Sequence, residues 1–189
     1  MKLKIHRTSE EELINLCRKG DRSAQKTLYE KYSSKMYGVS LRYVRNEAEA
    51  EDITITSFVK VFSKLDQFKS EGSFEGWIRR IVVNESLGYI RKNNNMYLEV
   101  DIEYADREPN YDSLGTRLEA EDLLKLVQQL PVGYRTVFNL YAIEGYSHQE
   151  IADQLGISEN TSKSQLSRAR ALLQKQLLNS EALLNRKIQ

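Results

Sequence analysis

Cysteine, proline and glycine are scarce in this sequence, whose 189 residues include one cysteine, two prolines and nine glycines. The single cysteine, Cys17, has no partner for an intrachain disulfide and cannot build a cysteine-based zinc site. A disulfide-stapled secreted scaffold is therefore excluded. The scarcity of proline and glycine, together with plentiful Leu, Glu, Lys, Arg and Gln, favours helices over a β-sandwich, a collagen-like chain or a disordered chain.

Long hydrophobic runs are absent as well. No window approaches about 18 apolar residues, and the N-terminal MKLKIHRTSEEEL lacks the apolar segment of a signal peptide. We therefore expect no membrane span and a cytoplasmic location.

Catalytic and metal-binding motifs are also missing. The sequence has no Walker loop, no GxGxxG turn and no HExxH helix. The two histidines, His6 and His148, have no cysteine or aspartate partner at a set spacing, and Cys17 is expected to pack as a small apolar residue. We expect no catalytic residue, no metal site and no cofactor, and therefore a protein that is not an enzyme.

The charges are nearly balanced overall but unevenly distributed. A net charge of +1, from 28 basic and 27 acidic residues, argues against coating nucleic acid through bulk charge. Residues 79–92 and 158–175 are nevertheless basic, whereas residues 96–115 are acidic, lack a hydrophobic period and contain Pro109 and Gly115. We interpret residues 96–115 as a linker between two domains, because so long a structureless stretch is uncommon inside a compact domain.

Helical patterns occupy the chain before this linker. Capping residues at Ser9, Asp21 and Asn46 predict three helices. A break at residues 66–73 follows, and a fourth helix then reaches about Lys92.

Helical patterns continue after the linker. Capping boxes at Thr116–Glu119 and Ser147–Glu150, and a cap at Ser158, predict helix starts. Pro131 separates a further helix, predicted from about Val132 to Glu144. The fold class is thus all-α, with two helical domains at residues 8–95 and 116–184.

Residues 147–170, SHQEIADQLGISENTSKSQLSRAR, have the pattern of a helix-turn-helix. Ile151 and Leu155 point inward, Ala152 is small where the helices cross, and Gly156 permits the left-handed backbone that ends the first helix. The early turns of the second helix carry short hydrogen-bonding groups and a cation, which suit base edges and phosphates in a major groove. These residues are Asn160, Thr161, Lys163, Ser164 and Gln165.

An ordinary helical hairpin with a solvated basic face is the alternative for this motif. Arg168 and Arg170 continue the basic surface in register, which favours DNA binding over that alternative.

The segment from Leu130 to Arg170 resembles region 4 of the sigma-70 family, in its extracytoplasmic-function (ECF, group 4) branch. AEDITITSFVKVF (50–62) resembles region 2.2, and FKSEGSFEGWIRRIVVNESLGYIRK (68–92) resembles regions 2.3 and 2.4. The resemblance covers about residues 10–95 and 116–178. It implies an RNA polymerase sigma factor that recognises the −35 and −10 promoter elements and promotes strand opening.

The same resemblance implies the partners. They are core RNA polymerase, through its β′ clamp and β flap, promoter DNA, and an anti-sigma factor. The family usually has Gln-Glu where Ile55-Thr56 stands. Ile55 therefore belongs either to a more apolar polymerase-binding surface or simply to the core. The polymerase-binding residues that the resemblance implies are Glu49, Asp52, Ile55 and Thr56.

Residues 66–73 match the family's loop that captures a base flipped out of the −10 element. Unstacking a base costs a few kcal/mol, which stacking on an aromatic ring and hydrogen bonds to the base edge offset. Phe74 and Trp77, at helical spacing, belong either to this pocket or to the core. The −10 residues that the resemblance implies are Lys60, Phe68, Lys69, Ser70, Ser73, Arg80 and Asn84.

The −35 element is expected to contact the second helix of the helix-turn-helix. Ser162 stands where the family commonly has Val, so its hydroxyl must find a partner or face water. Gly88 stands where the family often has Asp, and no physical reason for a glycine there is evident. The −35 residues that the resemblance implies are Ser158, Thr161, Lys163, Ser164, Ser167 and Arg168.

The linker length fits this function, because its residues can span at most about 70 Å, and two turns of B-DNA span about the same. A free-standing helix-turn-helix regulator is the alternative, but it leaves residues 66–73 without a use. A helical scaffold whose basic faces are only solvated is a second alternative.

Overall fold

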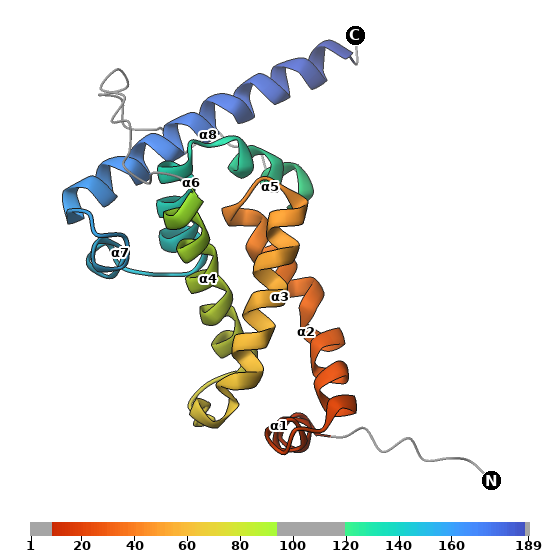
Figure 1. The fold of residues 1–189 in the computed structure, drawn as a ribbon. Helices are drawn as coiled ribbons and strands as arrows, with labels where there is room; N and C mark the ends of the chain where they lie inside the picture. Colours follow the sequence, from red (N-terminus) through yellow and green to blue (C-terminus); the bar gives the residue numbers. More distant parts are fainter. Residues whose placement is uncertain (1–8, 94–119, 188–189) are drawn as a thin grey trace. The chain divides into compact units, whose positions relative to one another are not determined.

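The computed structural model describes residues 9–93 and 120–187 and, within the second range, the side chains of residues 122–178. All regular secondary structure in these residues is helical (Figure 1), which confirms the all-α prediction. The chain divides into two compact units, Met1–Lys92 and Asn93–Gln189. The predicted linker and the Thr116–Glu119 capping box lie outside the described residues.

The described residues of the first unit form four α-helices and one 3-10 turn. The predicted helix starts are confirmed, because Ser9 Oγ accepts from Glu12 N at 3.1 Å and Asp21 Oδ1 accepts from Ala24 N at 2.9 Å. Asn46 Oδ1 accepts from Ala48 N at 2.8 Å in the same way. The elements are α1 (Glu10–Arg18), α2 (Arg22–Tyr43), α3 (Glu47–Ser63), η1 (Leu65–Gln67) and α4 (Phe74–Asn93).

The core of the first unit is formed by the inward faces of these helices. Leu28 and Met36 of α2, Phe58 of α3 and Ile78 of α4 are all buried. Cys17 is 3% exposed and packs as a small apolar residue, as predicted. Burial raises the pKa of its thiol, so the reactive thiolate is disfavoured.

The second unit starts with α5 (Ala120–Gln129) and α6 (Val132–Phe138). The sequence predicts one helix from 132 to 144, but α6 passes at Asn139–Ile143 into a π segment, η3. There Glu144 N donates to Asn139 O at 2.9 Å, five residues back. Hydrophobic spacing cannot distinguish such a segment from an α-helical turn, because the two differ by about one residue.

The helix-turn-helix completes the second unit, with α7 (His148–Leu155) and α8 (Glu159–Lys187). The predicted capping box is present, with Ser147 N donating to Glu150 Oε2 and Glu150 N donating to Ser147 Oγ. Gly156 ends α7 at φ 67°, as predicted. Both helices contribute to the unit's buried interior, α7 through Ile151 and α8 through Ala169.

One buried cation in the second unit escaped the sequence analysis. Arg135 is 3% exposed, and its Nη1 donates to Gln128 O at 2.9 Å and to Leu130 O at 3.3 Å. These carbonyls lie where α5 ends, so the guanidinium joins the start of α6 to the end of α5.

Among the helices that the structure describes, none is long and apolar enough to cross a bilayer.

Candidate nucleic-acid interface

The N-terminus of α8 is held by its own cap. Ser158 Oγ accepts from Thr161 N at 2.9 Å and lies 2.8 Å from Thr161 Oγ1. Both hydroxyls predicted to meet the −35 element are therefore engaged with each other, and they fix the first turn of the helix.

The next turns of α8 present polar side chains to solvent. Lys163, Ser164 and Ser167 are exposed and share one side of the helix, since positions three and four apart are neighbours. Lys163 Nζ lies 2.7 Å from Glu159 Oε1, and this pair holds the pKa of the Glu159 carboxyl below its usual value. The side chains of Lys163 and Glu159 are 55% and 43% exposed, so the pair is weak and a phosphate can compete for Lys163.

Arg168 differs from its neighbours, because it is half-buried and its Nη1 donates to Tyr134 Oη at 3.4 Å. The guanidinium is thereby directed partly toward α6. The structure thus brings together five of the six predicted −35 residues on or beside one exposed surface of α8. The sixth, Arg168, is held partly against the interior of the unit.

Ser162 has found a partner inside the protein. It is fully buried, and its Oγ lies 2.9 Å from His148 Nδ1 at the start of α7. The His148 ring stacks on Tyr141, with centroids 4.4 Å apart and planes at 21°. The Arg170 guanidinium lies 5.7 Å from the centroid of the Tyr141 ring. Sequence reasoning left His148 without a partner, because the contact joins separate elements.

The charge of His148 is governed by its surroundings. Partial burial lowers the pKa of this imidazole, and Lys163 and Arg170 lower it further, while Glu159 acts in the opposite direction. A neutral imidazole is therefore favoured at the junction of α7 and α8.

The 66–73 loop of the first unit is partly anchored and partly exposed. Phe68 is only 7% exposed, and its ring lies 5.0 Å from that of Phe74 and 5.6 Å from that of Trp77. We call these three residues the aromatic cluster. In this structure the Phe68 ring is packed inside the protein and is not open to a base. Phe74 is a core residue, and Trp77 is half-buried beside it.

The remaining candidates of this loop reach solvent. Lys69, Ser70 and Ser73 are exposed, and Ser73 Oγ accepts from Gly76 N at 3.1 Å as a cap for α4. Ser70 has φ 60°, in the left-handed region that non-glycine residues rarely adopt. The loop is thus held in a specific and mildly strained conformation.

An exposed strip follows on α4. Arg80, Asn84 and Gly88 are exposed and lie four residues apart, so they are adjacent on one face of the helix. Lys60 of α3 lies next to this α4 strip, because its Nζ donates to both carboxylate oxygens of Glu85 at 2.6 Å. The predicted −10 residues therefore fall on the loop, on the α4 strip and at the α3–α4 contact.

The candidate polymerase-binding residues lie on the outer face of α3. Asp52, Ile55 and Thr56 are exposed and Glu49 is half-buried. Ile55 is 46% exposed, so it is not a core residue, and Val59, one turn further, is 63% exposed. Sequence reasoning missed Val59, although its position outside the apolar stripe of this helix is a signal for such an exposed residue.

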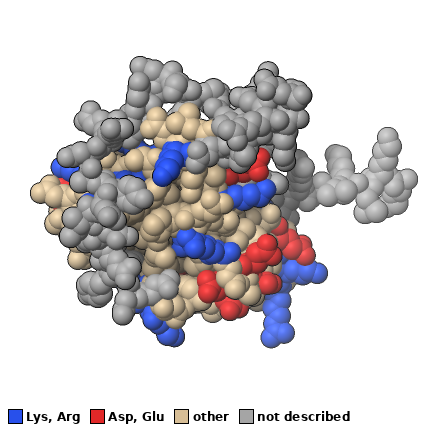
Figure 2. Space-filling view, turned by 90° about the horizontal axis from the view of Figure 1, so that it is seen from above, with Lys and Arg blue, Asp and Glu red and all other residues tan. Residues whose placement is uncertain are grey.

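Charges of both signs are interspersed on the face that Figure 2 displays, where Lys and Arg lie among neutral residues and beside acidic ones. Any affinity for nucleic acid therefore depends on local arrangements such as the α4 strip, since the net charge is only +1.

The two units match two protein families in chain order. Residues 28–96 match Sigma-70 region 2, and residues 120–173 match Sigma-70, region 4. The ECF RNA polymerase sigma factor SigW of Bacillus subtilis is 31% identical over 176 residues, which cover 87% of this chain and 94% of SigW. The ECF RNA polymerase sigma factor SigE of Mycolicibacterium smegmatis is 32% identical over 163 residues, which cover 82% of this chain and 63% of SigE.

A further relative and one solved structure agree with these matches. The RNA polymerase sigma-H factor of Pseudomonas aeruginosa is 27% identical over 181 residues, covering 89% of this chain and 93% of that protein. The sigma factor RpoE, solved in complex with the anti-sigma factor NepR from Bartonella quintana, has a similar fold with a TM-score of 0.50. It is 23% identical, and the match covers 82% of this chain and 96% of RpoE.

Proposed function

This chain belongs to the ECF RNA polymerase sigma factors, and we propose that it directs core RNA polymerase to promoters by reading the −35 and −10 elements and helping to open the strands. One observation carries the proposal. Two separate units, matching regions 2 and 4 in the family's order, each expose a polar helix face suited to nucleic acid.

The second unit is assigned to the −35 duplex, with residues 116–184 as its domain. A recognition helix that is capped at its N-terminus and exposes Lys163, Ser164 and Ser167 can enter a major groove and meet base edges and phosphates. Arg168 is assigned to a phosphate rather than to a base edge, because its hydrogen bond to Tyr134 directs the guanidinium toward α6. Ser158 and Thr161 are assigned to the backbone at the helix start.

The first unit is assigned to the −10 element, with residues 8–95 as its domain and residues 96–115 as the linker. Lys69, Ser70 and Ser73 would meet a flipped base, and Arg80 and Asn84 would meet the strand along α4. Lys60 supports the strip through Glu85. Phe68 supports the loop from beneath rather than stacking on the base.

The outer face of α3 is assigned to the β′ clamp of core polymerase. Exposed Ile55 and Val59 give this face an apolar centre, flanked by Asp52 and Thr56, which suits a protein partner better than DNA. The second unit would meet the β flap, and an anti-sigma factor would cover these surfaces in the inactive state. The chain contributes binding surfaces only, and polymerase carries out the chemistry, which would place its action in the cytoplasm.

Run-off transcription tests the proposal. Purified chain and core polymerase are incubated with genomic fragments, and discrete transcripts that require the chain are expected. Lys163→Ala should weaken binding to the −35 duplex by about 1–3 kcal/mol if it contacts a base. Asn84→Ala should reduce permanganate reactivity at −10 thymines while leaving −35 binding unchanged.

Lys26→Ala is a matched control, because Lys26 is an exposed cation on α2, a helix to which no DNA contact is assigned, and its Nζ lies 3.8 Å from Glu30 Oε1. Binding of duplex DNA by a chain that neither co-elutes with core polymerase nor supports transcription would favour the free-standing regulator. Loss of all nucleic-acid affinity at low salt would favour the scaffold.

A further inference from the structure

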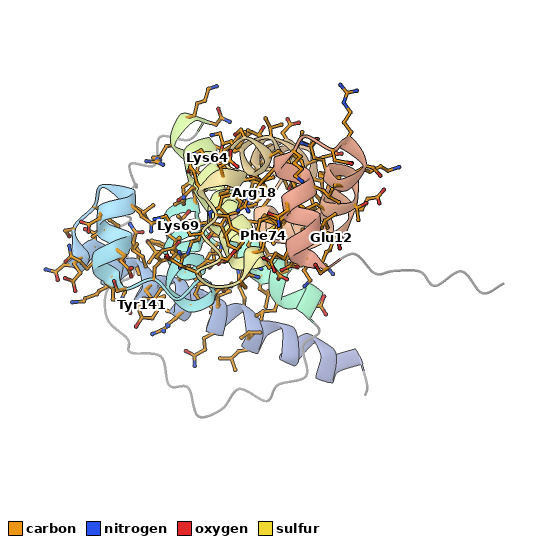
Figure 3. The ribbon with its side chains drawn as sticks, turned by 90° about the horizontal axis from the view of Figure 1, so that it is seen from below. Glu12, Arg18, Lys64, Lys69, Phe74 and Tyr141 are labelled. Atoms are coloured by element: carbon orange, nitrogen blue, oxygen red, sulfur yellow. The ribbon has the colours of Figure 1, made fainter. Side chains whose placement is uncertain are left out.

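Arg18, the last residue of α1, links this helix to the start of the 66–73 loop. Its Nη2 donates to Phe68 O at 2.7 Å and to Leu65 O at 3.2 Å, and its Nε donates to Leu65 O at 3.3 Å. The third guanidinium nitrogen, Nη1, donates to Asn15 Oδ1 at 3.0 Å within α1. Figure 3 labels Arg18 together with Lys69 of this loop and Phe74, which follows the loop at the start of α4.

The chemistry of this link suits an arginine. Leu65 O, at the start of η1, also accepts from Phe68 N at 3.1 Å, whereas Phe68 O lies at the residue just after η1. A planar guanidinium offers several donors in a fixed fork, so one arginine side chain can reach both carbonyls. Asp66 adds little, because it is 92% exposed and its Oδ1 is 4.0 Å from Arg18 Nε. The hydrogen bonds to the backbone therefore hold the loop, whatever side chains follow.

The anchored carbonyl belongs to the residue from which the exposed loop departs. Phe68 places its ring in the aromatic cluster, while its oxygen is held by Arg18. The next residues, Lys69 and the strained Ser70, extend from that fixed point. We propose that Arg18 is a positioning residue for −10 recognition, which holds the 66–73 loop in the conformation that receives the flipped base.

This inference rests on the proposed function of the loop. It assigns to α1 a role in strand capture although Arg18 itself need not touch DNA. α1 is in turn held on α2, where Glu10 accepts hydrogen bonds from Lys31 and Tyr32. The loop is thus connected through α1 to the longest helix of the first unit.

The test uses the full chain bound to core polymerase. The probe is a labelled single strand spanning the −10 element of a promoter recovered by run-off transcription. Arg18→Met is expected to lower affinity for this strand about tenfold, since charge-assisted hydrogen bonds that maintain the bound loop are lost. Affinity for the −35 duplex and for core polymerase should not change.

Trp77 supplies a spectroscopic readout, because it is the chain's single tryptophan and packs against Phe68. The emission of the folded Arg18→Met variant should shift as Phe68 moves. Arg22→Met, an exposed cation at the start of α2, is the charge-matched control and should change neither measurement. Arg18→Lys, which keeps the charge but not the fork, should fall between wild type and Arg18→Met, and carries the test if Arg18→Met does not fold.

Two comparisons decide the outcome. Glu10→Gln loosens α1 without touching the loop, so an equal loss of strand affinity in Glu10→Gln would reduce Arg18 to a general stabiliser and overturn the inference. Lys69→Ala tests the loop itself. If Lys69→Ala weakens strand binding but Arg18→Met does not, the inference fails and the proposed function stands. If neither variant changes binding, base capture by this loop is itself refuted.

Discussion

The hydrogen bond between His148 and Ser162 joins the two helices of the helix-turn-helix. The hydroxyl is fully buried, and at this position it can be tolerated only because the imidazole provides a partner. Tyr141 and Arg170 extend the contact to η3 and to the later part of α8. The buried hydroxyl of Ser162 is thus matched by a second residue in a different helix.

Removing the Ser162 hydroxyl should destabilise the second unit. Ser162→Ala leaves His148 Nδ1 without its protein partner, and we expect a loss of about 1 kcal/mol in unfolding free energy. The measurement is guanidinium unfolding followed by circular dichroism. Tryptophan fluorescence is not used, because the single tryptophan, Trp77, lies in the first unit.

A double-mutant cycle isolates this contact. Combining Ser162→Ala with His148→Ala should cost less than the sum of the two single changes. Strict additivity would mean that the two side chains do not interact in solution.

The lowered pKa of His148 predicts a pH dependence. In the unfolded chain the imidazole titrates near its ordinary value of about 6.5, and in the folded chain it titrates lower. The unfolded state then binds more protons, so the stability of the second unit is complete above about pH 6.5 and falls as the pH is lowered through the folded pKa. Unfolding free energies measured from pH 7 to pH 5 should show this decline.

His148→Asn should remove the decline, because no group then titrates at this position. The shifted carboxyls Glu10, Glu150 and Glu159 do not interfere, since their pKa values are lowered from 4.5 and their effects belong to a more acidic range. A decline that persists unchanged in His148→Asn would contradict the assignment.

At the scale of single elements, α4 carries two glycines in contrasting surroundings. A Cβ at Gly88 would meet no atom within 4 Å, whereas a Cβ at Gly76 would lie 2.9 Å from Ser73 Oγ, the capping oxygen. Gly88 therefore leaves the helix weaker without any packing reason, and Gly76 makes room for the cap.

Gly88→Ala should stabilise the first unit by about 0.5–1 kcal/mol, because alanine restricts the unfolded chain and favours the helix. Gly76→Ala, the matched control in the same helix, should destabilise it by disturbing the cap. Both are measured by denaturant unfolding followed through Trp77 fluorescence. Equal effects of the two substitutions would rule out this explanation.

The elements also show which structural features are readable from sequence. The caps at Ser9, Asp21 and Asn46, and the end of α7 at Gly156, were predictable because each depends on a few neighbouring residues. The π segment η3 and the burial of Arg135 were not, because each is decided by contacts between elements.

The candidate site divides in the same way. Exposure of the α4 strip follows from helical periodicity, but the inward packing of Phe68 depends on Phe74, Trp77 and the bond from Arg18 to the backbone. From the sequence, Ile55 could belong either to the core or to the polymerase-binding surface, and only the packing of α3 shows that it is exposed.

At the scale of the whole molecule, the two assigned DNA-reading faces belong to separate units. Their contributions to promoter binding should therefore be independent. Lys163→Ala and Asn84→Ala together should weaken the holoenzyme–promoter complex by the sum of their separate effects, to within about 0.5 kcal/mol. Electrophoretic titration of the promoter fragment measures this. If the double variant binds the promoter as tightly as the weaker-binding single variant, one face alone determines promoter affinity.

The π segment gives the second unit an unusual sensitivity to chain length. Each residue of an α-helix advances the next by about 100°, so deleting one residue within Asn139–Ile143 would restore a regular turn and rotate the Tyr141 ring away from His148. A one-residue deletion would thus change how η3 and α7 support α8, while every residue of the surface assigned to DNA is retained.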